Sequence, residues 1–225
     1  MEESMNVTLI NYSQSPENKN LLEQIAYAAR VSNPANQNNS ETAEKLIRYL
    51  IKNQHWSPLE MVSVCLEIET TRDIARQILR HRSFSFQEFS QRYAVADLGW
   101  EVKEARLQDT KNRQNSIEID SSDDEQRLIS TQWYNAQQEL LDKAINTYEW
   151  AINNGIAKEQ ARAVLPEGIT MSRMYMNGTL RSWVHYIQLR SANGTQKEHR
   201  QVALACADAI EPIFPMIKEF VNVNA

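Results

Sequence analysis

Residues 80–92 have the sequence RHRSFSFQEFSQR. Three arginines and one histidine share this stretch with three serines, three phenylalanines and a single carboxylate, Glu88. Arginine binds phosphate through two hydrogen bonds, hydroxyl groups donate further bonds, and aromatic faces and guanidinium planes stack on heterocyclic rings. The stretch is therefore typical of a site for a phosphorylated, planar ligand, although an arginine-rich surface turn would have the same composition.

The overall composition restricts the class of protein. The chain has 225 residues, a net charge of -5 and 42% hydrophobic residues, which predicts a single domain over 1–225 with a sizeable core. The acidic balance argues against a nucleic-acid partner, so the local arginine cluster favours a small anionic ligand. The 2 cysteines lack CxxC spacing, which indicates reduced thiols and a cytoplasmic location. No apolar run is as long as a membrane span and no signal-peptide pattern begins the chain, so we expect no membrane partner.

Hydrophobic periodicity predicts several helices and a few strands. The strands are expected at 7–12, 62–69 and 170–176. The helices are expected at 20–31, 41–53, 125–154, 157–164 and 180–189, and over most of 196–221, where two prolines disturb the pattern. These elements predict an α+β fold, a helix-rich single domain around a small mixed or antiparallel sheet.

Local signals place residues 80–92 among these elements. Thr70 and Asp73 have the spacing of a capping box, which predicts a helix that ends near Arg80. The rest of the stretch is then expected to continue as an extended loop, and Gly178 is expected to form a turn. The polar segment 97–126 has no periodicity, and a loop of this length is typically a functional lid or disordered.

A second candidate site lies on the helix expected at 180–189. Its apolar stripe ends at Ile187, and Arg190 continues the stripe one turn later. A cation at a core-facing position is costly unless it is paired, so Arg190 is either part of a structural ion pair or functional. Arg181 and His185 are four residues apart on the flank of this helix and could face one ligand together.

The spacing within residues 80–92 resembles the signature of the flavin-dependent thymidylate synthases. Six positions fill every fixed place of that signature: Arg80, His81, Arg82, Ser85, Ser90 and Arg92. Further matches are a His-x-Ser-x-x-Glu stretch, a Gln before the first Arg, an Arg before a Leu-Pro pair, and a late Arg-His-Arg helix: His55, Ser57, Glu60, Gln77, Arg162, Arg181, His185 and Arg190. The similarity extends from about Val7 to Pro215.

This resemblance implies an enzyme that methylates deoxyuridine monophosphate (dUMP) at C5 to give dTMP. It implies that 5,10-methylenetetrahydrofolate donates the carbon and that reduced flavin adenine dinucleotide (FADH2) supplies the hydride. NADPH or NADH would regenerate the reduced flavin. Members of the family are homotetramers with active sites shared between subunits, so the resemblance also implies a homotetramer.

The resemblance further implies which residues bind each ligand, and it implies no metal site. Those matched to dUMP binding are Gln77, Arg80, Glu88, Ser90, Gln91, Arg92, Arg162 and Arg190. Those matched to FAD binding are His55, Ser57, Glu60, Arg80, His81, Arg82, Glu88, Thr179, Arg181 and His185. Arg190 is the expected catalytic residue, because a permanent cation stabilises negative charge on the uracil ring.

Three other chemistries fit the sequence less well. A thiolate-type synthase needs an activated cysteine, but Cys65 falls in an expected strand and Cys206 on an alanine-rich helix, so both have the pattern of small core residues. A metal-dependent nucleotide phosphohydrolase needs ligands at metal spacing, and the 4 histidines are scattered without an HExxH motif. A single-strand nucleic-acid binder would stack bases on Arg and Phe, which the acidic balance disfavours.

Overall fold

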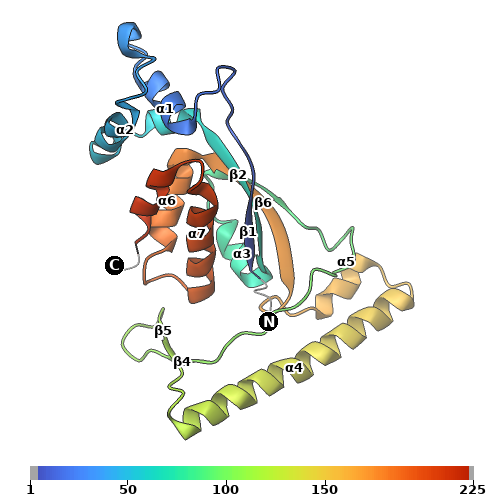
Figure 1. The fold of residues 1–225 in the computed structure, drawn as a ribbon. Coiled ribbons are helices and arrows are strands. Elements are labelled where there is room, and N and C mark those ends of the chain that lie inside the picture. Colours follow the sequence, from blue (N-terminus) through green and yellow to red (C-terminus); the bar gives the residue numbers. More distant parts are fainter. Residues whose placement is uncertain (1–4, 223–225) are drawn as a thin grey trace.

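The computed structural model describes residues 5–222, which are organised around a four-stranded sheet of order β1-β2-β6-β3 (Figure 1). The strands are β1 (Asn6–Tyr12), β2 (Ser63–Thr71), β3 (Phe84–Glu88) and β6 (Met171–Thr179). Each neighbouring pair is antiparallel. The predicted helix-rich α+β fold is therefore confirmed, and of the two expected sheet types the antiparallel one is present.

One face of the sheet carries the core. The helices α3 (Arg72–Ile78), α6 (Leu180–Arg190) and α7 (Lys197–Ile210) lie against it (Figure 1). Successive side chains of a strand point to opposite faces, so Leu66 and Ile68 are fully buried while Glu67 and Glu69 face the other way. On that other face the Arg173 guanidinium donates to the Glu69 carboxylate from Nε at 2.7 Å.

The N-terminal helices lie at one end of the sheet (Figure 1). They are α1 (Leu21–Ala29) and α2 (Ala43–Lys52), and a short 3-10 helix follows each of them, η1 (Pro34–Asn36) after α1 and η2 (Ser57–Met61) after α2. Asn20 and Glu23 form a reciprocal capping box at the start of α1. Both predicted helices are confirmed, each slightly shorter than expected. Within residues 5–222, none of the helices has the length and apolar character needed to cross a membrane.

The prediction of a capping box at Thr70 is wrong. Thr70 belongs to β2, and Thr71 is the N-cap of α3, without a hydrogen bond from its side chain to the helix backbone. Instead the Thr71 hydroxyl donates to the Asp73 carboxylate at 2.5 Å. The strand continues two residues further than expected because β6 supplies backbone partners as far as Met171.

Two further local predictions are wrong, and both concern the pairing of β3 with β6. Residues 84–88 form the edge strand β3 rather than an extended loop, and Gly178 lies inside β6 rather than in a turn. Phe84 is paired directly with Gly178, and a Cβ at that glycine would lie 2.3 Å from the Phe84 ring. A glycine is required at position 178 because the Phe84 ring leaves no room for a Cβ. Residues 84–88 form a strand because β6 offers them an open edge of the sheet.

The segment 97–126 crosses to the long helix α4 (Asp124–Asn153) and contains a small hairpin of β4 (Arg106–Gln108) and β5 (Ser116–Glu118) (Figure 1). Gln137 of α4 anchors this segment, because its amide accepts from the Lys103 N–H and donates to the Lys103 carbonyl, both at 2.8 Å. The hairpin and these bonds make it partly structured rather than a featureless loop.

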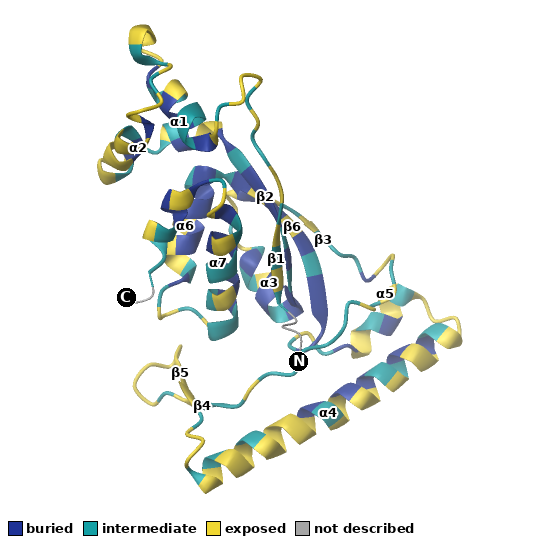
Figure 2. Ribbon diagram, in the orientation of Figure 1, coloured by how far each residue is buried: buried dark blue, intermediate teal, exposed yellow. Residues whose placement is uncertain are grey.

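The helix α4 is exposed over most of its length (Figure 2). Its C-terminal half buries Tyr148 and Ala151 against Ala161 and Leu165. By contrast Trp133, Leu140 and Trp150 are 46%, 55% and 59% exposed. The expected helix at 157–164 is divided into α5 (Lys158–Ala161) and the 3-10 helix η3 (Arg162–Val164), and the 3-10 helix η4 (Pro215–Phe220) follows α7.

Candidate active site

The predicted site residues form three groups in the single chain, and the first is at the ends of α3 and α6. Here Arg190 donates from Nε to Nε2 of His81 at 2.9 Å. His81 is half-buried and meets the Tyr186 ring edge-on at 4.9 Å between centroids. Burial, with the positive charges of Arg190 and Arg80, lowers the pKa of His81 to about 4. His81 is therefore neutral at pH 7 and accepts the Arg190 bond.

Within the described part of the chain, the charge of Arg190 is not balanced by a carboxylate. No ion pair to Arg190 is present among residues 5–222, and its hydrogen-bond partner is a neutral ring. The apolar stripe that precedes it is buried as predicted, with Trp183 and Ile187 both 0% exposed. The cation therefore lies at the end of a buried apolar stripe with a neutral ring as its hydrogen-bond partner.

Gln77 lies beside this pair, in the last turn of α3. Its amide oxygen is 3.3 Å from Nδ1 of His199, and its amide nitrogen donates to the Gln196 side chain at 2.8 Å. Arg80 and Arg82 are exposed on the loop to β3. The structure thus brings together five predicted residues from α3, the following loop and α6: Gln77, Arg80, His81, Arg82 and Arg190.

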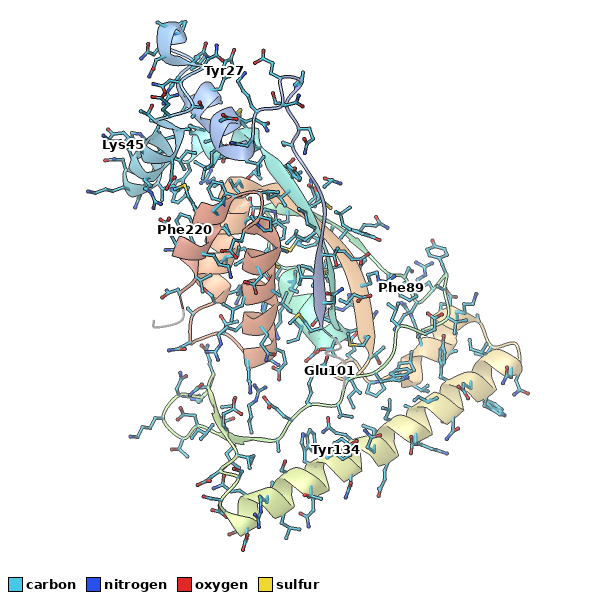
Figure 3. The ribbon with its side chains drawn as sticks, viewed as in Figure 1. Tyr27, Lys45, Phe89, Glu101, Tyr134 and Phe220 are labelled. Atoms are coloured by element: carbon cyan, nitrogen blue, oxygen red, sulfur yellow. The ribbon has the colours of Figure 1, made fainter. Side chains whose placement is uncertain are left out.

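The second group lies at the other end of β3, where the chain leaves the sheet at Phe89 and runs toward α5 (Figure 3). A cavity of about 380 Å³ opens here, lined by Arg72, Arg76, Gln91, Glu159, Arg162, Ala163, Leu165 and Glu167. Gln91 is 3% exposed and its amide Nε2 has no hydrogen-bond partner in the described residues. A buried donor without a partner costs free energy, which a bound acceptor would recover.

Glu88 is held in this second group by three neighbours. It accepts from the Ser172 hydroxyl at 3.0 Å and from Arg76 at 3.2 Å, and Arg72 is 4.0 Å away. Arg92 lies 3.8 Å from the Glu159 carboxylate. Among the predicted residues this end of β3 collects Glu88, Ser90, Gln91, Arg92 and Arg162.

Sequence reasoning missed Arg72 and Arg76 as site residues. Both reach Glu167 as well, at 3.6 Å and 3.5 Å. They are four residues apart at the start of α3 and therefore share a helix face, which is the signal that could have found them. Arg72 is only 7% exposed although it begins a short helix in a polar stretch, and burial of that kind cannot be read from the sequence.

The third group surrounds the start of α6. Arg181 forms an ion pair with Glu60 of η2. The His185 ring meets Trp56 edge-on at 4.4 Å between centroids, and burial together with the Arg181 charge lowers the pKa of His185. The remaining members are Thr179, the N-cap of α6, with His55 and Ser57 exposed at the start of η2.

No hydrogen bond or ion pair joins the first group to the second within residues 5–222. The strand β3 separates them, because Phe84 and Glu88 are about 13 Å apart in an extended strand. A single chain therefore does not bring all the predicted dUMP residues around one point, and the role of each residue stays a prediction.

Arginines that line a cavity, a further arginine bonded to a neutral histidine and two buried thiols fit an α+β enzyme that handles anionic ligands such as nucleotides without a cysteine nucleophile. The family described as "Thymidylate synthase complementing protein" matches residues 8–216. The chain is 49% identical over 195 residues to a "Probable flavin-dependent thymidylate synthase" of Paramecium bursaria Chlorella virus 1, covering 87% of this chain and 88% of that one. It is 50% identical to a flavin-dependent thymidylate synthase of Synechocystis sp., covering 86% of each chain.

A solved structure agrees in fold. PolB from Streptomyces cacaoi, a UMP/dUMP methylase crystallised with 5-Br dUMP, matches with a TM-score of 0.79 and 28% identity, over 96% of this chain and 93% of that one. The chain belongs to the flavin-dependent thymidylate synthase family of enzymes, and the resemblance found in residues 80–92 is confirmed.

Proposed function

We propose that this protein methylates dUMP at C5 to give dTMP, with 5,10-methylenetetrahydrofolate as carbon donor and FADH2 as hydride source. NADPH or NADH would regenerate the reduced flavin. The observation that carries the proposal is the state of Arg190, whose charge meets only a neutral histidine at the end of a buried apolar stripe. A fixed cation of this kind stabilises negative charge that develops on a pyrimidine ring.

Arg190 would act on dUMP electrostatically. It stays protonated at any working pH, so it cannot remove a proton. Negative charge on the uracil ring makes C5 electron-rich, and the guanidinium would hold that charge in a partly dry site. His81 keeps the guanidinium in place by accepting its Nε–H, which leaves the two terminal nitrogens for the ring edge. Gln77 beside it would meet the hydrogen-bonding edge of the base.

The cavity at the end of β3 suits the phosphate. Arg162 and Arg72 line it, and the unpartnered Gln91 amide supplies a buried donor. Phosphate oxygens accept hydrogen bonds from all of these groups. Ser90 and Arg92 follow directly in the chain and would add a hydroxyl and a guanidinium. Arg72 thereby joins the predicted phosphate-binding set.

The residues around α6 fit a flavin dinucleotide, judged by the donors that they present. Arg181, His185 and His55 offer cationic and aromatic groups, and Ser57 offers a hydroxyl, at an exposed surface between η2 and α6. Arg80, Arg82 and His81 would bind it from the loop before β3, with Glu88 and Thr179 as further contacts. When bound, FAD supplies the hydride chemistry, and the protein supplies binding and orientation.

The cysteines support a route without a protein nucleophile. Cys65 and Cys206 are both free and buried. Burial raises the pKa of each thiol, most strongly for Cys206, so neither forms the thiolate that a nucleophile requires. Two buried, unpaired thiols also fit a reducing compartment, and we place the enzyme in the cytoplasm on that ground.

A homotetramer with shared sites is supported by the division of the dUMP residues into two groups. A second subunit could bring the cavity of one chain next to Arg190 of another. The exposed apolar side chains of α4, Trp133, Leu140 and Trp150, provide surface that such an assembly would bury.

Purification and one spectrum test the proposal. We expect a yellow protein with visible flavin absorbance that converts dUMP to dTMP when supplied with methylenetetrahydrofolate and NADPH. A colourless protein that neither binds added FAD nor forms dTMP would overturn the proposal. Elution of the purified protein at the mass of one chain would overturn only the claim that subunits share a site, and the proposed reaction would stand.

A further inference from the structure

A continuous chain of hydrogen bonds passes through Gln77, and one end of it is a carboxylate. Glu198, at the start of α7, accepts from Arg106 at 2.5 Å and from the Gln196 amide nitrogen at 3.0 Å. Burial raises the pKa of Glu198, but its hydrogen bonds from Arg106 and Gln196 outweigh burial, so the pKa is lowered overall and Glu198 is ionised at pH 7.

An ionised carboxylate only accepts, so it sets the direction of the bonds that follow. Gln196 must turn its N–H to Glu198 and its oxygen to Gln77. The Gln77 amide nitrogen donates to that oxygen at 2.8 Å. From this end, the nitrogen of Gln77 faces Gln196 and its oxygen faces the other way.

The other end of the chain is His199, which is 0% exposed. Burial, with the charges of Arg190 and His81, lowers the pKa of His199 to about 3, so the ring carries one proton at pH 7. Nδ1 faces the Gln77 oxygen at 3.3 Å, and Nε2 faces the Tyr186 hydroxyl at 3.1 Å. Because the Gln77 oxygen accepts, the proton is on Nδ1, and Nε2 accepts from Tyr186.

The carboxylate end therefore imposes one orientation on the Gln77 amide, and His199 in the matching tautomer holds it there. Its oxygen retains a second lone pair and its nitrogen a second N–H, since each is used once in the chain. We propose that His199 is a positioning residue that holds the Gln77 amide in the orientation that selects a uracil over a cytosine nucleotide. This inference rests on the proposed function, in which Gln77 meets the edge of the base.

The selection follows from the two base edges. Uracil presents an N3–H donor between two carbonyl acceptors, which matches an amide oxygen beside an amide N–H. Cytosine presents an N3 acceptor beside an amino donor, which matches the same amide only when it is reversed. A held amide rejects cytosine because both polar groups would be left unpaired. An amide free to turn could accept either base.

The test compares affinities for dUMP and dCMP in the FAD-loaded enzyme, by calorimetric titration. We expect the wild type to bind dUMP at least about a hundredfold tighter than dCMP, as a site built on paired hydrogen bonds rejects the wrong partner strongly. His199→Phe should reduce this ratio about tenfold, because one end of the chain no longer fixes the amide. The ratio is informative because a general loss of stability would weaken the binding of both nucleotides alike.

His199→Asn and Tyr186→Phe separate positioning from packing. The amide nitrogen of an asparagine can occupy the place of Nδ1 and donate to Gln77, so His199→Asn should restore most of the ratio. Tyr186→Phe keeps the buried ring but removes the donor to Nε2, so the His199 proton can move and the ratio should fall severalfold. Tyr148→Phe removes a different buried hydroxyl, bonded to the Ala96 N–H, and should leave the ratio unchanged.

An unchanged ratio in Tyr186→Phe overturns the inference even if His199→Phe does not fold. Equal losses in His199→Asn and His199→Phe would also overturn it, because a structural role alone would explain them. A wild type that binds dUMP without discriminating against dCMP refutes the selection while the proposed function stands. A wild type that binds neither nucleotide refutes the proposed function itself.

Discussion

Two arginines of the site, Arg190 and Arg72, differ in what surrounds their charge. Arg72 is 7% exposed and has two carboxylates within 4.0 Å, those of Glu88 and Glu167. Arg190 is bonded to a histidine that is neutral at pH 7. The same side chain is thus compensated by the protein in one place and left uncompensated in the other. A ligand at Arg72 must compete with carboxylates, whereas a ligand at Arg190 meets the full charge.

The largest effect is expected when the uncompensated arginine is altered. Arg190→Lys keeps the charge but loses the planar fork that meets a ring edge in two bonds. We expect turnover to fall about a hundredfold or more, the scale of removing one preorganised charge-stabilising donor. The measurement is dTMP formation under saturating substrates, with flavin binding and flavin reduction by NADPH followed separately and expected to persist.

Arg48→Lys is the matched control for this change. Arg48 is exposed and paired with Glu44 and Glu219 on α2 and η4, and neither carboxylate belongs to the three groups. The turnover of the Arg48→Lys variant should stay within about twofold of the wild type, since exposed ion pairs contribute little to stability. Near-normal methylation by Arg190→Lys would contradict the proposal that the uncompensated charge of Arg190 activates the uracil ring. Loss of flavin reduction in this variant would indicate that Arg190 acts on the cofactor instead.

A smaller effect is expected at the compensated end. Arg92 faces Glu159 at 3.8 Å and is predicted to bind the substrate phosphate together with Ser90. Arg92→Ala should raise the dissociation constant for dUMP at least about tenfold, because a hydrogen bond to a charged group contributes roughly 1.5–3 kcal/mol. Equilibrium titration with dUMP measures this, while flavin content should change little. Unchanged dUMP affinity would contradict the phosphate assignment.

The two histidines near Arg190, His81 and His199, have lowered pKa values, which predicts that stability depends on pH. The pKa of His199 falls from 6.5 when unfolded to about 3 in the folded protein. Between these values the unfolded chain binds more protons, so stability rises with pH up to about 6.5 and is then constant for this group. Going from pH 7.5 to 5.5, His199 should lower the free energy of unfolding by about 1 kcal/mol.

Urea unfolding at several pH values measures this slope, and His199→Asn is its control. The variant has no group that titrates at this position, so its stability should fall less between pH 7.5 and 5.5. His81 adds to the slope in the same direction, because its pKa is lowered to about 4. Equal slopes in the wild type and in His199→Asn would show that His199 is not the source.

The smallest effect is expected at the thiols. Cys65 and Cys206 are buried with raised pKa values, so the double variant Cys65→Ala, Cys206→Ala should keep most of its turnover. A modest loss of stability from the two cavities is expected in thermal unfolding. A folded double variant without activity would show that a thiol takes part, and that Arg190 is not the means of activating the ring.

The sequence by itself determined features that depend only on residues close together in the chain. The alternation in 62–69 is enough to predict β2, since half-buried strands need it whatever they pair with. The apolar stripe that ends at Arg190 is likewise a property of one helix. The spacing within residues 80–92 identified the family, because a ligand site requires defined residue types at defined positions.

Tertiary structure alone decided which distant groups became partners. Gly178 lies in a strand because Phe84, 94 positions earlier, packs against it. Arg72 is buried beside Glu88 and Glu167, and His199 meets Gln77 and Tyr186, although none of these pairs is adjacent in the chain. Hydrogen bonds and burial act through space, so a lone histidine in a polar helix has the same sequence pattern whether it faces solvent or the side-chain amide of another helix.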